Sequence, residues 1–400
     1  MTDTANTEIP MSSSEPSPFP LVGLQAVSNA QNEWVALSFR VPAAPGDALA
    51  ALLAALAYPD VHAALAPLDY VVSLPDPLAL DATHLEQLPP ARVVLVVPAA
   101  ACAEPAVQAR CKQLAERGYR VLVDGEAGIH AGRCAIRGMA HDCARELPGP
   151  LAMLTMSGPN LARNVGDAAR LAEARQAGFD WFSGDYALHP ERDGNGGDGT
   201  SRKRLLALLG LLARDADSRE LEILLKQDPA LAYHLLKVVN SAAFAPSSPI
   251  HSFGQAINVL GRRQLQRWLQ LLLYARQAED GAANALLPLA AVRAAQMEAL
   301  VKQRGGDRDQ QDMAFVVGVF SLLDVLLDMP MTEIVSALSL DLEVVMALLD
   351  RAGALGELLA LVERDIADGG ALRGLGLDHE SWWASQLQAH HWAIQVSRNL

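Results

Sequence analysis

The stretch LEILLKQDPALAYHLLKVVNSAAFAPSSPIHSFGQAINVLGRRQLQRWLQLLLY, residues 221–274, decides the fold of the second half of the chain. Within it, Asp228-Pro229 combines an N-cap residue with a proline at the first helical position, where the missing N–H has no partner to lose. Ser252 and Gln255 form a capping box for a short helix, and Gly261 ends that helix. The stretch therefore predicts successive helices with short connections.

The last helix of this stretch has a strongly amphipathic pattern. Its apolar residues recur at helical spacing and are Leu265, Trp268, Leu269, Leu272 and Leu273. Arg263 and Arg267 lie one turn apart on the polar side of a chain with a net charge of −14. Because arginine binds carboxylates in bidentate fashion and is enriched at interfaces, both are candidate residues for binding an acidic partner protein. A solvated face with intramolecular ion pairs is the alternative interpretation. The helix end at Asn240 and Ser241 is the next candidate.

The segments LEILLKQDPALAYHLLKVVNSAAF, INVLG and LQRWLQLLL resemble, in this order, the opening of an HDOD domain, an HD-related output domain of bacterial signalling proteins. The resemblance continues into AFVVGVFSLLDVLLDMPMTEI and implies an all-α domain that binds other signalling proteins. HD-type phosphohydrolases hold metals with histidine and aspartate on such helices. His234, His379 and the adjacent pair His390-His391 form no such ligand set, so we expect no metal site here.

From Leu21 to Phe182, short strand-like runs alternate with helices at a period of roughly thirty residues, which favours a parallel α/β layer or barrel. The strand-like runs are LVGLQAVS (21–28), EWVALSFRV (33–41), DYVVSL (69–74), RVVLVVP (92–98), YRVLVD (119–124), PLAMLTMSG (150–158) and FDWFSGD (179–185). Helices are expected at 47–57, 105–117 and 167–177. Because the region is short for a complete barrel, some elements should be missing or shortened.

This half of the chain resembles the EAL domain of cyclic di-GMP phosphodiesterases in LVGLQAVSNAQNEWVALSFR, RVVLVV, CKQLAERGYRVLVD and AGFDWFSGDYALHPE. The resemblance places the family's metal-binding and catalytic positions on Ala36, Ser73, Val96, Asp124-Gly125 and Ser183. Only Asp124 keeps a carboxylate, and one carboxylate cannot hold the divalent ions that phosphodiester hydrolysis needs. The resemblance therefore implies a degenerate EAL-like domain with no catalytic residues, no metal and no cofactor.

Composition limits the partners and the location of the protein. Asp and Glu number 46 against 32 Lys and Arg, so a nucleic-acid backbone is not the expected ligand. The nearly apolar run from Met313 to Leu327 contains Ser321 and Asp324 and is too short to span a membrane. The first twenty residues lack the basic start and the apolar segment of a signal peptide and are expected to be a disordered tail, so we expect a cytoplasmic protein that contacts no membrane.

These patterns predict an α+β multidomain protein in four segments: a disordered tail (1–20), a shortened, degenerate EAL-like (β/α) barrel (21–190), a flexible linker (191–203) and an all-α HDOD domain (204–400). We expect a non-catalytic signal-transduction adaptor whose helical domain binds other signalling proteins. A sensor that binds cyclic di-GMP without cutting it, and a residual cyclic di-GMP phosphodiesterase, are the alternatives. The sequence is also compatible with a homo-oligomer and does not fix the oligomeric state.

Overall fold

The computed structural model describes residues 19–42, 45–191, 252–274, 283–338, 340–364 and 366–399. Between 192 and 251 it describes only 207, 209–211, 220, 223, 235–237, 239, 240 and 250. Most of the predicted tail, all but the first residue of the predicted linker, and the helix start at Asp228-Pro229 lie outside the described residues.

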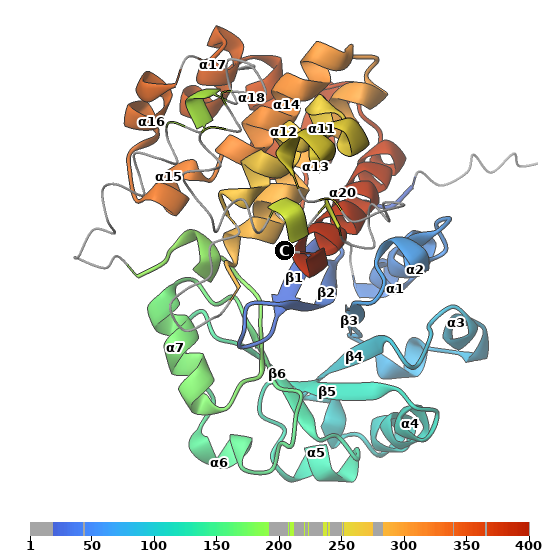
Figure 1. Cartoon of the computed structure of the whole chain (residues 1–400). Coiled ribbons are helices and arrows are strands. Elements are labelled where there is room, and N and C mark those ends of the chain that lie inside the picture. Colours follow the sequence, from blue (N-terminus) through green and yellow to red (C-terminus); the bar gives the residue numbers. More distant parts are fainter. Residues whose placement is uncertain are drawn as a thin grey trace, which may run out of the picture.

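The N-terminal part is a closed barrel of eight strands that neighbour one another in sequence order (Figure 1). The strands are β1 (Gly23–Ser28), β2 (Trp34–Arg40), β3 (Asp69–Ser73), β4 (Val93–Pro98), β5 (Arg120–Asp124), β6 (Gly138–Asp142), β7 (Leu161–Arg163) and β8 (Trp181–Phe182). Strand β1 runs antiparallel to both β2 and β8, and the other neighbouring pairs are parallel. The predicted barrel is confirmed.

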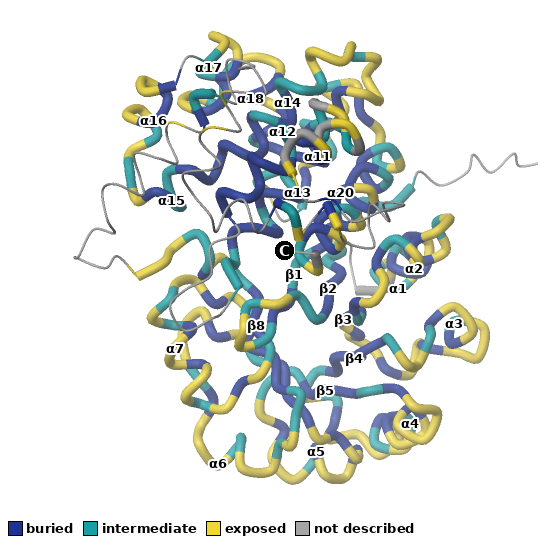
Figure 2. Tube along the Cα trace, in the orientation of Figure 1, coloured by how far each residue is buried: buried dark blue, intermediate teal, exposed yellow. Residues whose placement is uncertain are grey.

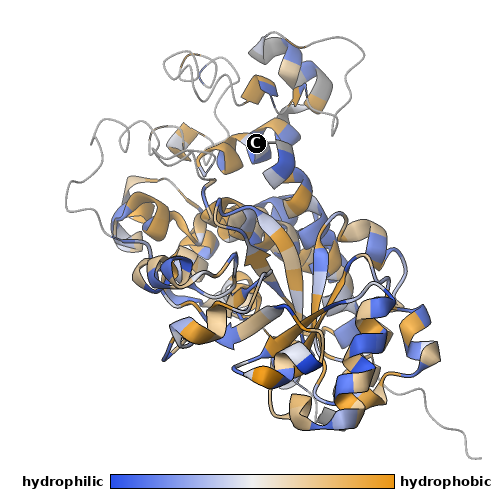
Figure 3. Ribbon diagram, turned by 90° about the horizontal axis from the view of Figure 1, so that it is seen from below, coloured by the Kyte–Doolittle hydropathy of each residue, from blue (hydrophilic) through white to orange (hydrophobic). Residues whose placement is uncertain are grey.

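The helices around the barrel are short, as its length predicts. They are α1 (Pro45–Leu56), α2 (Val61–Ala64), α3 (Ala82–Glu86), α4 (Pro105–Glu116), α5 (Ile129–Arg133), α6 (Pro150–Met153) and α7 (Ala168–Ala177). All eight strands are nevertheless present, so the shortening falls on the helices. In Figure 3 these outer helices carry both hydrophobic and hydrophilic residues, as amphipathic helices that cover a barrel do.

Strand residues alternate between two apolar clusters, as the two-residue repeat of a strand requires. One cluster packs the outside of the barrel against its helices and includes Leu37, Tyr70 and Leu95. The other fills the barrel interior and consists of Val27, Ala36, Val71, Val94, Val96, Leu122, Ala140 and Leu161. The interior is therefore a packed apolar core.

One expected strand is wrong. Residues 150–158 begin with helix α6, and the strands of this region are β6 and β7 instead. Strand β6 is five residues long and begins with Gly138, while β7 has only three residues. Neither carries the run of β-branched residues from which a strand is recognised in a sequence.

Every element described beyond residue 252 is helical, in agreement with the predicted all-α domain. The helices are α11 (Phe253–Leu260), α12 (Arg262–Leu272), α13 (Leu286–Gln303), α14 (Arg308–Phe320), α15 (Leu323–Leu327), α16 (Met331–Ala337), α17 (Leu342–Asp350), α18 (Gly353–Val362), α19 (Gly369–Gly374) and α20 (His379–Asn399). The Ser252 hydroxyl accepts from the Gln255 N–H at 3.3 Å, as the capping box predicts. The apolar stripe from Leu265 to Leu273 is buried.

Helix α20 belongs to the cores of both parts of the molecule. Its Trp383, Leu387 and Ile394 join the apolar cluster on the outside of the barrel. Its Trp382 and Val396 join the core of the helical part. The Gln386 side chain also donates to the Val22 carbonyl at 2.9 Å. Figure 1 shows α20 beside β1 and β2, and Figure 2 shows buried residues along this junction, so the two parts share a packed interface.

Candidate functional site

A barrel places its chemistry at the carboxyl ends of its strands. Of the first three positions that the resemblance gives, only Ser73 ends its strand, whereas Ala36 is the third residue of β2 and pairs with Asp69 at the start of β3. Ala36 of β2 and Val96 of β4 are 0% and 2% exposed within the apolar interior cluster. Ser73 ends β3 and is exposed. The resemblance to EAL domains places metal ligands at these residues, yet the side chains of Ala36 and Val96 are apolar and buried.

Asp124, at the end of β5, is held by an arginine from two strands away. Arg163 ends β7, and its guanidinium donates a hydrogen bond to the Asp124 carboxylate in an ion pair. The Arg163 side chain is 19% exposed, so much of its charge is withdrawn from water. The one carboxylate that keeps a ligand position is therefore already paired with a cation.

A second carboxylate, Asp142, ends β6 and pairs in register with Arg163. Burial alone would raise the pKa of Asp142, but hydrogen bonds from the Ala144 N–H, at 3.0 Å, and from the Asn164 side chain, together with nearby Arg163, lower the pKa below its usual value. This carboxylate is consequently ionised at neutral pH. Asp124, Arg163 and Asp142 thus place one fixed positive charge beside two negative ones at the barrel mouth.

This arrangement suits hydrogen-bond acceptors better than a divalent cation. A guanidinium offers five N–H donors and no lone pair, whereas Mg²⁺ requires oxygen ligands in nearly octahedral order. Within the described ranges, no group of three or more His, Cys, Asp or Glu side chains gathers in a way that could hold a metal ion.

The last strand end carries Ser183, which is 1% exposed. Its hydroxyl has no hydrogen-bond partner among the residues that the structure describes. The next residue, Gly184, has a φ of 137°, and a Cβ there would lie 2.4 Å from the Val165 backbone. Only glycine fits this turn, which fixes the direction in which the chain leaves the mouth.

The four cysteines, Cys102, Cys111, Cys134 and Cys143, are all free and buried. Burial, with the neighbouring Cys134, raises the pKa of the Cys102 and Cys111 thiols to about 12. These thiols are therefore uncharged near neutral pH and are poor nucleophiles.

The two arginines selected from the sequence have partners within the chain. Arg263 Nε lies 2.5 Å from Asp312 Oδ1, and one Arg267 terminal nitrogen lies 2.6 Å from Glu298 Oε1 and 2.9 Å from Asp312 Oδ1. The Arg267 guanidinium also lies 4.7 Å from the Phe315 ring centre. These contacts tie α12 to α13 and α14, as the alternative interpretation expected. Partner docking through the two arginines stays a prediction.

Asn240 also serves the fold. Its side-chain amide donates to the Leu236 and Ile250 carbonyls, both at 2.8 Å, and its carbonyl accepts from the Ile250 N–H at 2.7 Å. It therefore connects the two ends of the segment between residues 240 and 250. Ser241 lies outside the described residues.

Among the helices that the structure describes, none combines the length and the apolar composition needed to cross a bilayer.

Comparison with known proteins gives one family match and two relatives. Residues 203–329 match the HDOD domain model. Over 252 residues the chain is 31% identical to a Vibrio cholerae protein named "Cyclic di-GMP phosphodiesterase CdgJ", which covers 60% of this chain and 56% of the relative. Over 314 residues it is 26% identical to the "Uncharacterized protein YuxH" of Bacillus subtilis, covering 72% of this chain and 75% of that protein. The chain thus matches just over half the length of the first relative.

Solved structures similar to this chain include EAL domains. The match to a standalone EAL protein from Vibrio cholerae spans 43% of this chain and 92% of that protein's chain, with 14% sequence identity and a TM-score of 0.33. The match to the EAL domain of Mycobacterium smegmatis DcpA spans 41% of this chain and 89% of that domain's chain, with 13% sequence identity and a TM-score of 0.34. Scores this low carry no functional assignment. The matched segment and the strand pairing together establish that this chain carries an HDOD domain behind a closed eight-stranded barrel.

Proposed function

We propose that the protein is a non-catalytic signalling regulator, in which the HDOD domain binds other signalling proteins and the barrel does not hydrolyse cyclic di-GMP. The observation that carries the catalytic half of this proposal is the ion pair between Arg163 and Asp124 at the barrel mouth. Apolar packing of Ala36 and Val96 in the barrel interior supports it further.

The physical reason is the charge balance that metal-assisted hydrolysis needs. Divalent ions that activate water and stabilise a phosphoryl group are held by several carboxylate or amide oxygens. At this mouth, the Arg163 guanidinium already neutralises Asp124, and the neighbouring Asp142 is the second carboxylate beside that one cation. A catalytic metal would have to displace Arg163 and then find further ligands on strands whose inward side chains are apolar.

A sensor that binds cyclic di-GMP without cutting it is the second candidate. One specific observation favours it: the Arg163 Nε atom is buried and has no hydrogen-bond partner within the described part of the chain. A free N–H of a guanidinium suits a phosphate oxygen. The third candidate, phosphodiesterase activity, is suggested by the name of the relative CdgJ.

Titration calorimetry with cyclic di-GMP, in EDTA and then in Mn²⁺, separates the three functions. The non-catalytic regulator should release no binding heat under either condition. A sensor should bind in EDTA and lose affinity in Arg163→Gln, which removes the charge. A phosphodiesterase should require Mn²⁺ and should convert the nucleotide during the titration, which would contradict the proposal.

The partner-binding half requires its own experiment. Arg263 is the more exposed of the two candidate arginines, 39% against 15% for Arg267, so it is the one that a partner reaches first. Affinity capture with the whole chain should lose an acidic partner in Arg263→Gln. Thermal unfolding of the same variant is the control, because Arg263 also contacts Asp312. Unchanged capture by a folded variant would remove this face from consideration.

A further inference from the structure

A pocket of about 390 Å³, the junction pocket, lies where the barrel meets the helical part of the chain. From the barrel it is lined by residues around the starts of β2 and β3, including Glu33 and Trp34. From the helical part it is lined by Leu287 of α13 and by Ile394 and Arg398 of α20. The junction pocket therefore lies at the amino ends of these strands and not at the carboxyl-end mouth of the barrel, and boundaries of this kind often hold small ligands.

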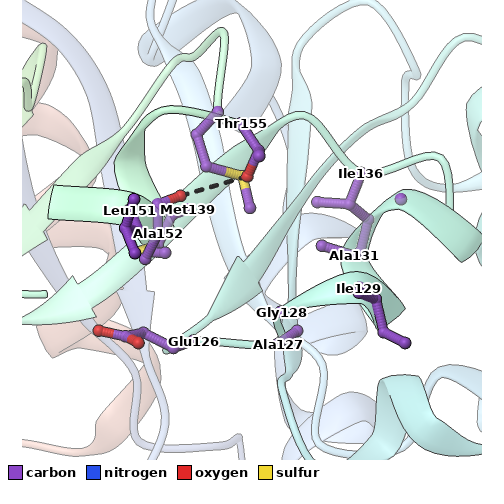
Figure 4. A pocket seen from close by; sticks show the side chains of 12 residues that line it. Glu126, Ala127, Gly128, Ile129, Ala131, Ile136, Met139, Leu151, Ala152 and Thr155 are labelled. Carbon is purple, nitrogen blue, oxygen red and sulfur yellow. Dashed lines mark hydrogen bonds between the residues drawn. The ribbon is translucent and has the colours of Figure 1, made fainter. Parts of the chain in front are cut away.

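A second pocket, of about 450 Å³, lies between α5 and α6 and has a largely apolar lining (Figure 4). Among the described residues that line it, Glu126 is the one with a charge, and its carboxylate already accepts from the Gly149 N–H at 2.8 Å. This lining does not select a ligand. The junction pocket differs because its lining carries two charges of opposite sign.

The two charged groups of the junction pocket, Glu33 and Arg398, are both exposed and form no ion pair with each other. Glu33 accepts one hydrogen bond, from the Asn29 side-chain amide to its Oε2 at 2.8 Å. Within the described ranges, the Arg398 guanidinium makes neither an ion pair nor a side-chain hydrogen bond. A ligand could therefore pair with both groups without breaking an ion pair inside the protein.

The rest of the lining supplies apolar surface and one hydroxyl. Leu287 and Ile394 are 6% and 5% exposed. The ring centre of Trp34 lies 5.9 Å from that of His390 at an interplanar angle of 31°, and this contact holds the indole at the pocket wall. The Ser397 hydroxyl also lines the pocket, and it is buried without a hydrogen-bond partner in the part of the chain that the structure describes. Such a lining suits an apolar group that carries a hydrogen-bonding end.

We propose that the junction pocket binds a small zwitterion with an apolar side chain, of the class of the large apolar α-amino acids. Its ammonium group pairs with Glu33, its carboxylate pairs with Arg398, and its side chain packs against the apolar lining. A zwitterion satisfies both charges, whereas an organic anion would meet Glu33 and a simple amine would meet Arg398, each with a like charge. The site is independent of the proposed role of the barrel mouth, and its occupant would contact the barrel and the helical part together.

Titration calorimetry with the whole chain at about pH 7.5 tests this assignment, with L-leucine and L-phenylalanine as probes. The methyl ester of each removes the carboxylate charge, and the N-acetyl form removes the ammonium charge. At least one free amino acid should bind about tenfold or more tightly than both of its blocked forms. Glycine keeps both charges without an apolar side chain and should bind at least about tenfold more weakly than that amino acid.

Two variants assign the charges to their partners. Arg398→Gln should bring the affinities of the amino acid and its methyl ester to within about twofold, and Glu33→Gln should do the same for the amino acid and its N-acetyl form. A purely steric effect of the blocking groups would persist in both variants. The matched control, Glu116→Gln with Arg117→Gln, changes exposed residues at the end of α4 outside both pocket linings and should leave the affinities unchanged. Circular dichroism checks that each variant is folded.

Several results would overturn the proposal. Neither amino acid binding at millimolar concentration, or equal affinity of the free and blocked forms, would remove the zwitterion. Tighter binding of an N-acetyl form than of its free amino acid would assign the pocket to organic anions. Binding that is lost in Leu151→Asp and unchanged in Arg398→Gln would place the ligand between α5 and α6 instead.

Discussion

Replacing the buried His390 should remove an acid-sensitive contribution to the stability of the interface between the barrel and the helices. His390 lies in α20 and is 5% exposed. Its Nδ1 donates to the Gln386 carbonyl at 2.8 Å, and its ring centre lies 5.9 Å from that of Trp34 in β2. Burial lowers the pKa of His390 from 6.5 to about 4, an effect that the Gln386 carbonyl only partly opposes.

The sign follows from which state binds the proton. An unfolded His390 takes up a proton as the pH falls through 6.5, whereas the folded one stays neutral until about pH 4. The stabilising contribution is therefore complete above pH 6.5 and is lost between pH 6.5 and about 4. Each pH unit in that window corresponds to about 1.4 kcal/mol, so the full effect is about 3 kcal/mol.

Urea unfolding followed by circular dichroism at about pH 7.5 and about pH 5.5 measures this contribution. Between the two, the wild type should lose about 1.4 kcal/mol more stability than His390→Gln, since about one pH unit lies below 6.5. His189→Gln, at an exposed histidine, is the matched control and should behave as the wild type does. An identical pH dependence for the wild type and His390→Gln would refute the reasoning.

Three further substitutions test other parts of the structure by thermal unfolding. Trp383→Ala, at a fully buried residue of α20, should cost about 3–5 kcal/mol and destabilise the barrel as well, and an unaffected barrel transition would contradict the shared interface. Gly184→Ala should cost more than about 1 kcal/mol, because its φ of 137° and the nearby backbone exclude a Cβ; an unchanged midpoint would argue against this turn. Arg267→Ala should cost about 1–3 kcal/mol by leaving the Glu298 carboxylate without its nearest cation, whereas the exposed control Arg117→Ala should change stability by about 0.5 kcal/mol or less.

Much of the helical part could be predicted from its sequence because local signals agree there. The period from Leu265 to Leu273 matches a buried helical stripe, and the Ser252 cap forms as its spacing suggests. The run from Met313 to Leu327 was less informative. It reads as one stripe, yet the structure divides it into α14 and α15 near Ser321, whose hydroxyl bonds back to the Gly318 carbonyl at 2.8 Å. Such a break depends on packing between helices, and the spacing of apolar residues in the sequence does not predict that packing.

Two adjacent tryptophans in the sequence indicate the shared role of α20. Trp382 and Trp383 are adjacent, so they point about 100° apart on a helix. Both are buried, at 3% and 0% exposure, which requires the helix to be covered on two sides. Adjacent large apolar residues in an otherwise amphipathic helix therefore indicate a helix between two cores.

The ion pair of the barrel mouth could not be read from the sequence. Asp124 was identified from its place after a clear strand, but Arg163 ends a strand of only three residues and lies 39 positions away. Their contact depends on the closure of the barrel and on the register of β5, β6 and β7. Arg163 can be placed beside Asp124 only once the ends of β5, β6 and β7 are aligned with one another.

The most direct test of the central claim is a search for linear product after prolonged incubation of the purified whole chain with cyclic di-GMP and Mn²⁺. Chromatography should find no product above a buffer control, because the Arg163 guanidinium already pairs with Asp124 and the residues at two other expected ligand positions, Ala36 and Val96, are apolar. Product that forms with the wild type and disappears in Asp124→Ala would contradict the account.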